Sequence, residues 1–146
     1  MHEERWQEGL RWMDVVYGDG FSAHHGDAAS APPFLEATVE RLFAEVWSRP
    51  GLSVRDRRLL VVGATAALGR PELLRVQLLG GLRRGEFDAD QLQEMVLQLA
   101  YYVGWGKATL VSAAVQGALT DFADDGPTPG PASADATKST RKDEDE

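Results

Sequence analysis

The sequence contains no cysteine among its 146 residues. Disulfide bonds, thiolate metal ligands, cysteine nucleophiles and Cys-x-x-Cys redox pairs all require that residue. Each of these chemistries is therefore excluded, whatever the fold.

The chain also has fewer basic than acidic residues. Its 15 lysines and arginines and 23 aspartates and glutamates give a net charge of -8. Phosphate backbones and anionic membrane surfaces repel such a chain, so neither nucleic acid nor a membrane is an expected partner. No apolar run approaches the roughly 20 residues of a membrane span, and residues 1–13 are charged throughout, unlike a secretion signal. We expect a cytoplasmic protein.

Apolar residues instead recur at helical spacing, and the sequence predicts six helices and no strand. Leu74, Leu78 and Leu82 form one such stripe, and Asp88 followed by Gln91 is a typical N-terminal capping pattern. The third predicted helix is apolar nearly all round, so we expect it to be the central buried helix. The predicted helices cover about residues 6–17, 33–47, 53–68, 71–84, 88–103 and 107–122.

The length and the 43% hydrophobic content suit one domain with one core. After Phe122 the composition changes abruptly to proline, alanine, serine and threonine, and residues 138–146 are almost wholly charged. This end lacks large apolar residues with which to offset the entropy of ordering. We predict one helical domain over residues 1–123 and a disordered acidic tail over residues 124–146.

A long loop is predicted between Gly18 and Pro33, and it carries His24 and His25, two of the three histidines. Either histidine could enter a site from the loop as a proton carrier; the alternative is that both are plain surface residues. Adjacent histidines lack the spacing of a metal-ligand pair, so we expect no metal there. Nothing in the sequence indicates a cofactor.

Four short segments occur in order along the chain, at Gly18-Asp19, Trp47-Ser48-Arg49-Pro50-Gly51-Leu52, Ala66-Ala67-Leu68-Gly69-Arg70 and Tyr102-Val103-Gly104-Trp105. With this order and spacing the chain resembles the carboxymuconolactone decarboxylase family, which also contains the alkylhydroperoxidase-D-like proteins. The resemblance implies an all-α, alkylhydroperoxidase-D-like helical bundle that assembles into trimers or hexamers. It also implies active sites in clefts that a neighbouring subunit sometimes closes.

One departure from the family pattern bears on function. The family's decarboxylases usually carry a histidine shortly after the leucine-glycine-arginine string, where this chain has Gln77. An amide does not exchange protons near neutral pH, which argues against general acid–base catalysis at that position. Gln77 could instead hydrogen-bond a substrate carbonyl or carboxylate, or lie on a helix surface. The peroxidase branch of the family needs two cysteines, so thiol peroxidase activity is excluded.

Glu94 belongs to a polar stripe on an otherwise apolar helix, together with Gln98 and Tyr102. In the functional interpretation Glu94 is a buried catalytic acid or base that faces a dry pocket, with Gln98 and Tyr102 binding substrate. In the alternative, the stripe is the solvated side of an amphipathic helix.

Arg49 and Arg57 are candidates to clamp a substrate carboxylate through bidentate hydrogen bonds. The alternative is that they pair with carboxylates between helices or across a subunit boundary. Trp105 lies between two glycines, and it either walls a pocket or fills the gap between the last two helices.

The predicted function is that of a lyase, or a diverged tailoring enzyme, that acts on a small carboxylated cyclic or unsaturated substrate. An arginine would hold the carboxylate, Gln77 would stabilise developing charge, and Glu94 or a loop histidine would return a proton. Gln77 indicates that ordinary 4-carboxymuconolactone is not the substrate. The alternative is a noncatalytic homo-oligomeric binding or assembly protein, whose acidic tail could contact a basic partner.

Overall fold

The computed structural model describes residues 1–125, and in this range the chain is helical and contains no strand. The prediction of an all-α chain with six helices is confirmed there, and the second predicted helix consists of α2 and a π-helix, η2. The elements are α1 (His2–Tyr17), a 3₁₀-helix η1 (Phe21–His24), α2 (Pro33–Glu36), η2 (Ala37–Trp47), α3 (Val54–Ala67), α4 (Pro71–Arg83), α5 (Ala89–Val103) and α6 (Trp105–Asp124).

α6 is longer than the sequence indicated at both ends. It begins at Trp105 because Gly104 alone, with a φ of 90°, turns the chain between α5 and α6. It ends at Asp124, and the next residue, Asp125, accepts a hydrogen bond from Nε of Arg83 at 2.8 Å. The last helix thus extends one residue past the predicted boundary at 123, and residues 126–146 of the predicted tail lie outside the described residues.

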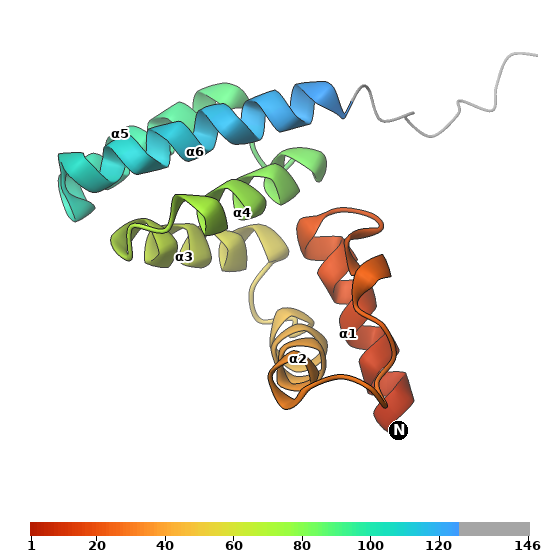
Figure 1. Cartoon of the computed structure of the whole chain (residues 1–146). Coiled ribbons are helices and arrows are strands. Elements are labelled where there is room, and N and C mark those ends of the chain that lie inside the picture. Colours follow the sequence, from red (N-terminus) through yellow and green to blue (C-terminus); the bar gives the residue numbers. More distant parts are fainter. Residues whose placement is uncertain (126–146) are drawn as a thin grey trace, which may run out of the picture.

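The helices form two groups that meet where α1 contacts α4 (Figure 1). In one group α3 packs on α4, α4 on α6 and α6 on α5; in the other, α1 packs on η2. Each group has its own apolar core, so the single core expected from the chain length is divided in two. The large buried members are Leu74, Leu78 and Leu92 in the first core, and Trp6, Phe43 and Trp47 in the second.

The π-helical form of η2 was not predicted. Its buried apolar residues, Val39, Phe43 and Trp47, recur every four positions, and the rings of Phe43 and Trp47 stack with centroids 6.3 Å apart. The wider turn of a π-helix keeps a strict four-residue repeat on one face better than the 3.6 residues of an α-helix. As a consequence Leu42 and Val46, which would lie on the same face as Val39 and Phe43 in an α-helix, are exposed.

The expectation that the third helix is the central buried one is wrong for the single chain. Leu60 of α3 is 65% exposed, and Leu68, directly after the helix, is 72% exposed. α3 lies at the edge of its group, where only one stripe of its surface faces α4, α5 and α6 (Figure 1). By contrast, the predicted stripe on α4 and the capping box of Asp88 and Gln91 at the start of α5 are both confirmed.

Two glycines allow helices to approach with their backbones in contact. A Cβ atom on Gly9 of α1 would lie 2.1 Å from the carbonyl oxygen of Val39 in η2. A Cβ atom on Gly80 of α4 would lie 2.2 Å from the carbonyl oxygen of Val16 in α1. Real carbon–oxygen contacts are never so short, so only glycine permits these crossings, and the second one joins the two helix groups.

Gly80→Ala should therefore destabilise the fold, by about 1–3 kcal/mol and towards the upper end because a backbone oxygen cannot move aside cheaply. Gly106→Ala is the control, because Gly106 is helical, exposed and has nothing within 4 Å of an added Cβ. This control should be neutral or slightly stabilising. Denaturant unfolding followed by circular dichroism measures both, and equal midpoints for the two variants would contradict the close crossing.

Candidate active site

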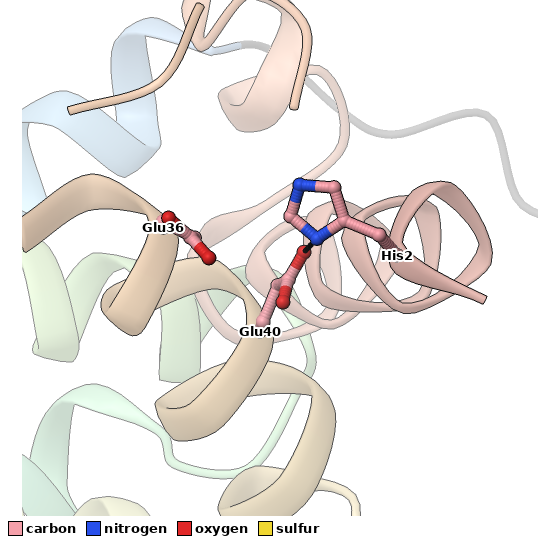
Figure 2. A group of neighbouring side chains, drawn as sticks. All are labelled: His2, Glu36 and Glu40. Carbon is pink, nitrogen blue, oxygen red and sulfur yellow. Dashed lines mark ion pairs between the residues drawn. The ribbon is translucent and has the colours of Figure 1, made fainter. Parts of the chain in front are cut away.

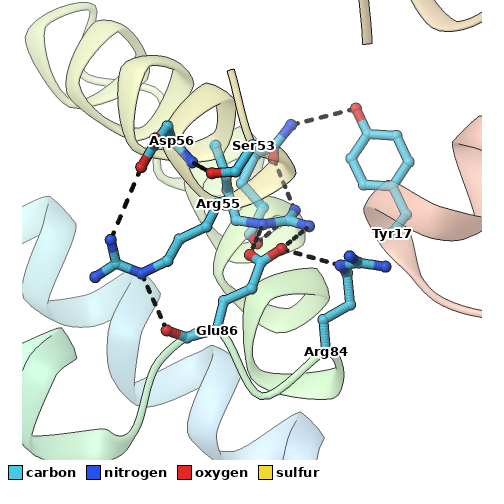
Figure 3. A network of polar contacts seen from close by, with 8 residues as sticks. Tyr17, Ser53, Arg55, Asp56, Arg84 and Glu86 are labelled. Carbon is cyan, nitrogen blue, oxygen red and sulfur yellow. Dashed lines mark hydrogen bonds and ion pairs between the residues drawn. The ribbon is translucent and has the colours of Figure 1, made fainter. Parts of the chain in front are cut away.

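A buried ion-pair network begins at Arg58 of α3, whose residue exposure is 0%. Its Nε atom donates to Oε2 of Glu86 at 2.5 Å, and its Nη1 atom donates to both the main-chain and side-chain oxygens of Gln77 at 3.1 Å each. Arg84 also contacts Glu86, with 3.0 Å between its Nε and Oε1 (Figure 3). A buried guanidinium is tolerated when it is paired and hydrogen-bonded, and both conditions are met here.

The Arg58 side chain fits against α4 because two consecutive glycines of that helix face it. A Cβ atom on Gly80 would lie 2.8 Å from Nη1 of Arg58, and one on Gly81 would lie 3.1 Å from its Cδ. The same Gly81 Cβ would also lie 2.6 Å from the ring of Phe87. The pair of glycines thus creates the space in which the guanidinium reaches Gln77 and Glu86.

The network fixes the direction of the Gln77 amide. Arginine can only donate hydrogen bonds, so the atom of Gln77 that faces Nη1 of Arg58 is the carbonyl oxygen Oε1. The amide nitrogen Nε2 therefore points the other way, and it donates to the phenol oxygen of Tyr17 at 3.4 Å (Figure 3). Within residues 1–125, no further hydrogen bond uses the Tyr17 hydroxyl hydrogen or the second Nε2 hydrogen of Gln77.

Tyr17 and Gln77 line a cavity of about 390 Å³ where the two helix groups meet. This volume lies in the range of small-molecule sites. Most of the wall is apolar, and it includes Met13, Phe21, Phe43, Val61, Leu73 and Val76. The polar side chains of the wall are Tyr17, His25, Thr38, Thr65 and Gln77.

The two threonines of this cavity donate their hydroxyl hydrogens to their own helices. Thr38 donates to the carbonyl oxygen of Phe34 at 2.7 Å, and Thr65 donates to that of Val61 at 2.7 Å. The side-chain hydrogens that remain free for a bound molecule therefore belong to Tyr17 and Gln77.

His25 enters the cavity from the loop that follows η1. Its Nδ1 atom lies 3.2 Å from the carbonyl oxygen of Ser22, and its ring packs near Phe21, which in turn contacts the ring of Tyr17. A carbonyl oxygen only accepts, so Nδ1 carries a hydrogen and the neutral ring keeps its lone pair on Nε2. His25 thus has one nitrogen held by the protein and one available for proton exchange.

Burial shapes the acidity of Tyr17. Loss of contact with water raises the pKa of its phenol above the ordinary value, and the nearby charge of Arg58 and the hydrogen bond from Gln77 oppose that rise. The phenol is therefore a neutral hydrogen-bond donor over the whole physiological pH range.

The other predicted site residues lie away from this cavity. Glu94 and Gln98 line a separate groove of about 420 Å³ together with Arg55, and Glu94 is exposed, so the expectation of a buried carboxyl in a dry pocket is wrong for the single chain. Trp105 borders a third, open groove of about 580 Å³ between α5 and α6. Tyr102 is 80% exposed.

The predicted arginine clamp and the second loop histidine also lie elsewhere. Nη2 of Arg57 donates to the carbonyl oxygen of Arg49 at 3.0 Å, so the two arginines meet at the turn between η2 and α3. Neither contributes to the wall of the cavity, and His24 is exposed beside it. Of the nine predicted residues, only His25 and Gln77 line this cavity.

Comparison with known proteins gives two matches. The model of the carboxymuconolactone decarboxylase family matches residues 32–117 of this chain. A protein from Acinetobacter baylyi with the name 4-carboxymuconolactone decarboxylase is 34% identical over 104 residues, which cover 70% of this chain and 77% of that protein. The chain belongs to the carboxymuconolactone decarboxylase family.

The family match covers only part of the cavity. Arg58, Gln77 and Glu86 fall inside residues 32–117, whereas Tyr17 and His25 precede them. The matched region thus supplies the buried network, and the preceding segment contributes a phenol and an imidazole to the wall of the cavity. None of the described helices is long and apolar enough to cross a membrane.

Sequence reasoning missed Tyr17 and Arg58. Tyr17 follows Leu10 and Met13 at helical spacing, so the sequence does not distinguish it from an apolar residue of the first helix. Arg58 stands in a run of charged residues, but it shares a helical face with Val62 and Thr65, four and seven positions later, and all three are buried. That spacing is the signal that could have identified it.

Arg58→Met should lower the free energy of unfolding by about 3–5 kcal/mol, because it leaves the carboxylate of Glu86 buried with less compensation. Arg84→Met removes the more exposed partner of the same carboxylate and should cost no more than about 1 kcal/mol. Urea unfolding of both variants provides the comparison. An equal loss in the two would show that the buried pair is not the anchor of this region.

The raised pKa of Tyr17 makes the stability of the fold decrease at alkaline pH. The folded protein keeps the phenol proton at a pH where the unfolded chain has released it, so this contribution is complete below about pH 10 and is lost as the pH rises through the folded pKa. Unfolding measured across this alkaline range should show a loss of stability that Tyr17→Phe lacks. Identical alkaline profiles for the two proteins would contradict the burial of the phenol.

Proposed function

We propose that this protein is a carboxy-lyase that acts on a small carboxylated cyclic or unsaturated substrate in the cavity lined by Tyr17, His25 and Gln77. The observation that carries the proposal is the position of His25. The family's usual helical histidine is replaced by Gln77, and a histidine from the loop after η1 lines the same cavity. The site thus has an imidazole available for proton transfer.

The proposed reaction uses each of these groups once. The bond between the substrate carbon and its carboxylate breaks, carbon dioxide leaves, and the electron pair passes into an adjoining carbonyl to form an enolate. The Tyr17 hydroxyl and the free amide hydrogen of Gln77 stabilise the enolate oxygen, as donors that are already in place. Protonated His25 delivers a proton to carbon from Nε2 and recovers one from water.

The apolar wall supports this chemistry. A carboxylate loses charge as carbon dioxide forms, so apolar surroundings favour the transition state over the bound substrate. Neither arginine nor lysine lines the cavity within residues 1–125, and Arg58 is held by Gln77 and Glu86. The arginine clamp that the sequence suggested is therefore not part of the proposal.

The substrate belongs to the same class as that in the relative's name, but it is not 4-carboxymuconolactone itself. A glutamine in place of histidine at the centre of the site alters both the hydrogen bonding and the proton supply that a ligand meets. We propose a related carboxylated lactone or a β-keto acid, in which the enolate can form.

Self-association is part of the proposal. Large apolar side chains remain exposed on α3, α5 and α6, and a second copy of the chain would cover them. They include Leu60, Leu97, Tyr101, Trp105 and Leu110. We expect a homo-oligomer, either a trimer or a hexamer, as the family resemblance implies.

A panel of carboxylated lactones and β-keto acids, followed by absorbance and by carbon dioxide release, tests the activity. His25→Gln should lower kcat by about 10²–10⁴-fold, the usual contribution of a general acid. Tyr17→Phe should lower it by about 10²–10³-fold, as expected for loss of one preorganised donor. His24→Gln is the matched control, because His24 is the exposed neighbour of His25, and it should retain activity.

Glu94→Gln separates this site from the groove on α5. If Glu94→Gln abolishes turnover and His25→Gln does not, the reaction takes place in the other groove and the proposal is wrong. If a folded oligomer shows no turnover with any substrate of the panel, a noncatalytic binding role replaces the proposed lyase.

A further inference from the structure

A second cluster of functional side chains lies where the start of α1 meets α2 and η2, and none of its three members lines the cavity. His2 is the first residue of α1, Glu36 ends α2, and Glu40 is one turn further along, in η2. One ligand atom from each of the three side chains lies within 4.8 Å of the other two (Figure 2). His2 is distant in sequence from the two glutamates, so no motif revealed the cluster.

Glu40 is the unusual member of the cluster. Its side chain is only 9% exposed, and its Oε1 atom is buried without a hydrogen-bond partner among the described residues. Nδ1 of His2 lies 2.6 Å from this oxygen, but the two atoms do not have the geometry of a hydrogen bond. A buried carboxylate oxygen whose close partner is poorly aligned for a hydrogen bond is costly, and a bound cation would lower that cost.

The helices hold these groups in a fixed relation. Glu36 and Glu40 are four residues apart, so they project from the same side of the continuous α2–η2 helix. Gly9 brings the backbone of α1 against Val39, the neighbour of Glu40, and thereby fixes how the start of α1 lies on η2. The cluster is therefore built on two packed helices rather than on a loop.

We propose that His2, Glu36 and Glu40 bind one divalent transition-metal ion that fastens the start of α1 to the α2–η2 helix. One imidazole and two carboxylates suit Zn²⁺ or Mn²⁺, whereas Ca²⁺ and Mg²⁺ prefer oxygen ligands alone. The three protein ligands leave further positions on the ion for water. The site is independent of the proposed lyase activity.

Only small side-chain movements are needed for binding. Tetrahedral zinc with bonds of about 2.0–2.2 Å holds its ligand atoms about 3.3–3.6 Å apart. The three ligand atoms lie within 4.8 Å of one another, so movements of about 1 Å bring them to the ion. The side chain of His2 is 53% exposed, so it can rotate away from its short contact with Glu40 and make room for the ion.

The test is metal titration of the full chain after removal of metals with a chelator. Calorimetry with Zn²⁺ should show one ion per chain, and Co²⁺ should give the visible absorption of a nitrogen- and oxygen-ligated ion. Saturating Zn²⁺ should raise Tm by roughly 5 °C, because the ion binds only the folded state.

Two substitutions and two controls identify the ligands. His2→Gln and Glu40→Gln should each weaken Zn²⁺ binding by at least about 100-fold. Loss of a residue that only hydrogen-bonds to a metal ligand already lowers metal affinity by about 10–100-fold. Glu45→Gln, an exposed carboxylate of the same η2 helix, and His24→Gln should bind as the wild type does. Comparing metal-induced shifts in Tm with each variant's own metal-free form removes any effect on folding.

Two results would overturn the proposal. The first is an unaltered affinity in both His2→Gln and Glu40→Gln, which would place any bound ion elsewhere. The second is no binding of Zn²⁺, Mn²⁺ or Co²⁺ to the wild type at millimolar ion, which would leave His2 and Glu40 as an ordinary ion pair.

Discussion

The buried guanidinium of Arg58 holds together three parts of the chain that are distant in sequence. It bonds from α3 to Gln77 on α4 and to Glu86 in the connection to α5, and Gln77 passes the network on to Tyr17 at the end of α1. Packings that separate these elements would leave a charge buried without partners, which costs several kcal/mol. The same bonds orient the Gln77 amide towards Tyr17, so the geometry of the site follows from a requirement of folding.

Local features of the fold could be predicted from the sequence, whereas features set by tertiary contacts could not. The apolar stripe of Leu74, Leu78 and Leu82 on α4 depends only on residues within a few turns of one another, and so does the capping box at Asp88. Both predictions are confirmed. The π-form of η2 and the exposed side of α3 depend on what each helix packs against. An apolar side chain such as Leu60 has the same sequence signal whether it faces a core or a free surface.

The site was predictable only in pieces. Gln77 stood out as a departure from the family pattern, and His25 as one of few histidines, but nothing in the sequence showed that a loop 52 positions earlier reaches the same cavity. Arg58 looked like one charge in an exposed run, because burial of an arginine is uncommon. Glu94 stood out as part of a polar stripe on an apolar helix, yet it lies in a different groove. The metal cluster likewise needs the α1–η2 packing to exist.

The central claim is that small carboxylated ligands occupy the cavity beside Gln77 and not the groove beside Glu94. NMR chemical shifts of glutamine side-chain amides test it directly during titration with a nonreactive carboxylated lactone, because each region has its own reporter. The account predicts large shifts for the amide of Gln77 and for the His25 ring, with little change at Gln98 in the groove of Glu94. A shift at Gln98 that leaves Gln77 and His25 unchanged would contradict it.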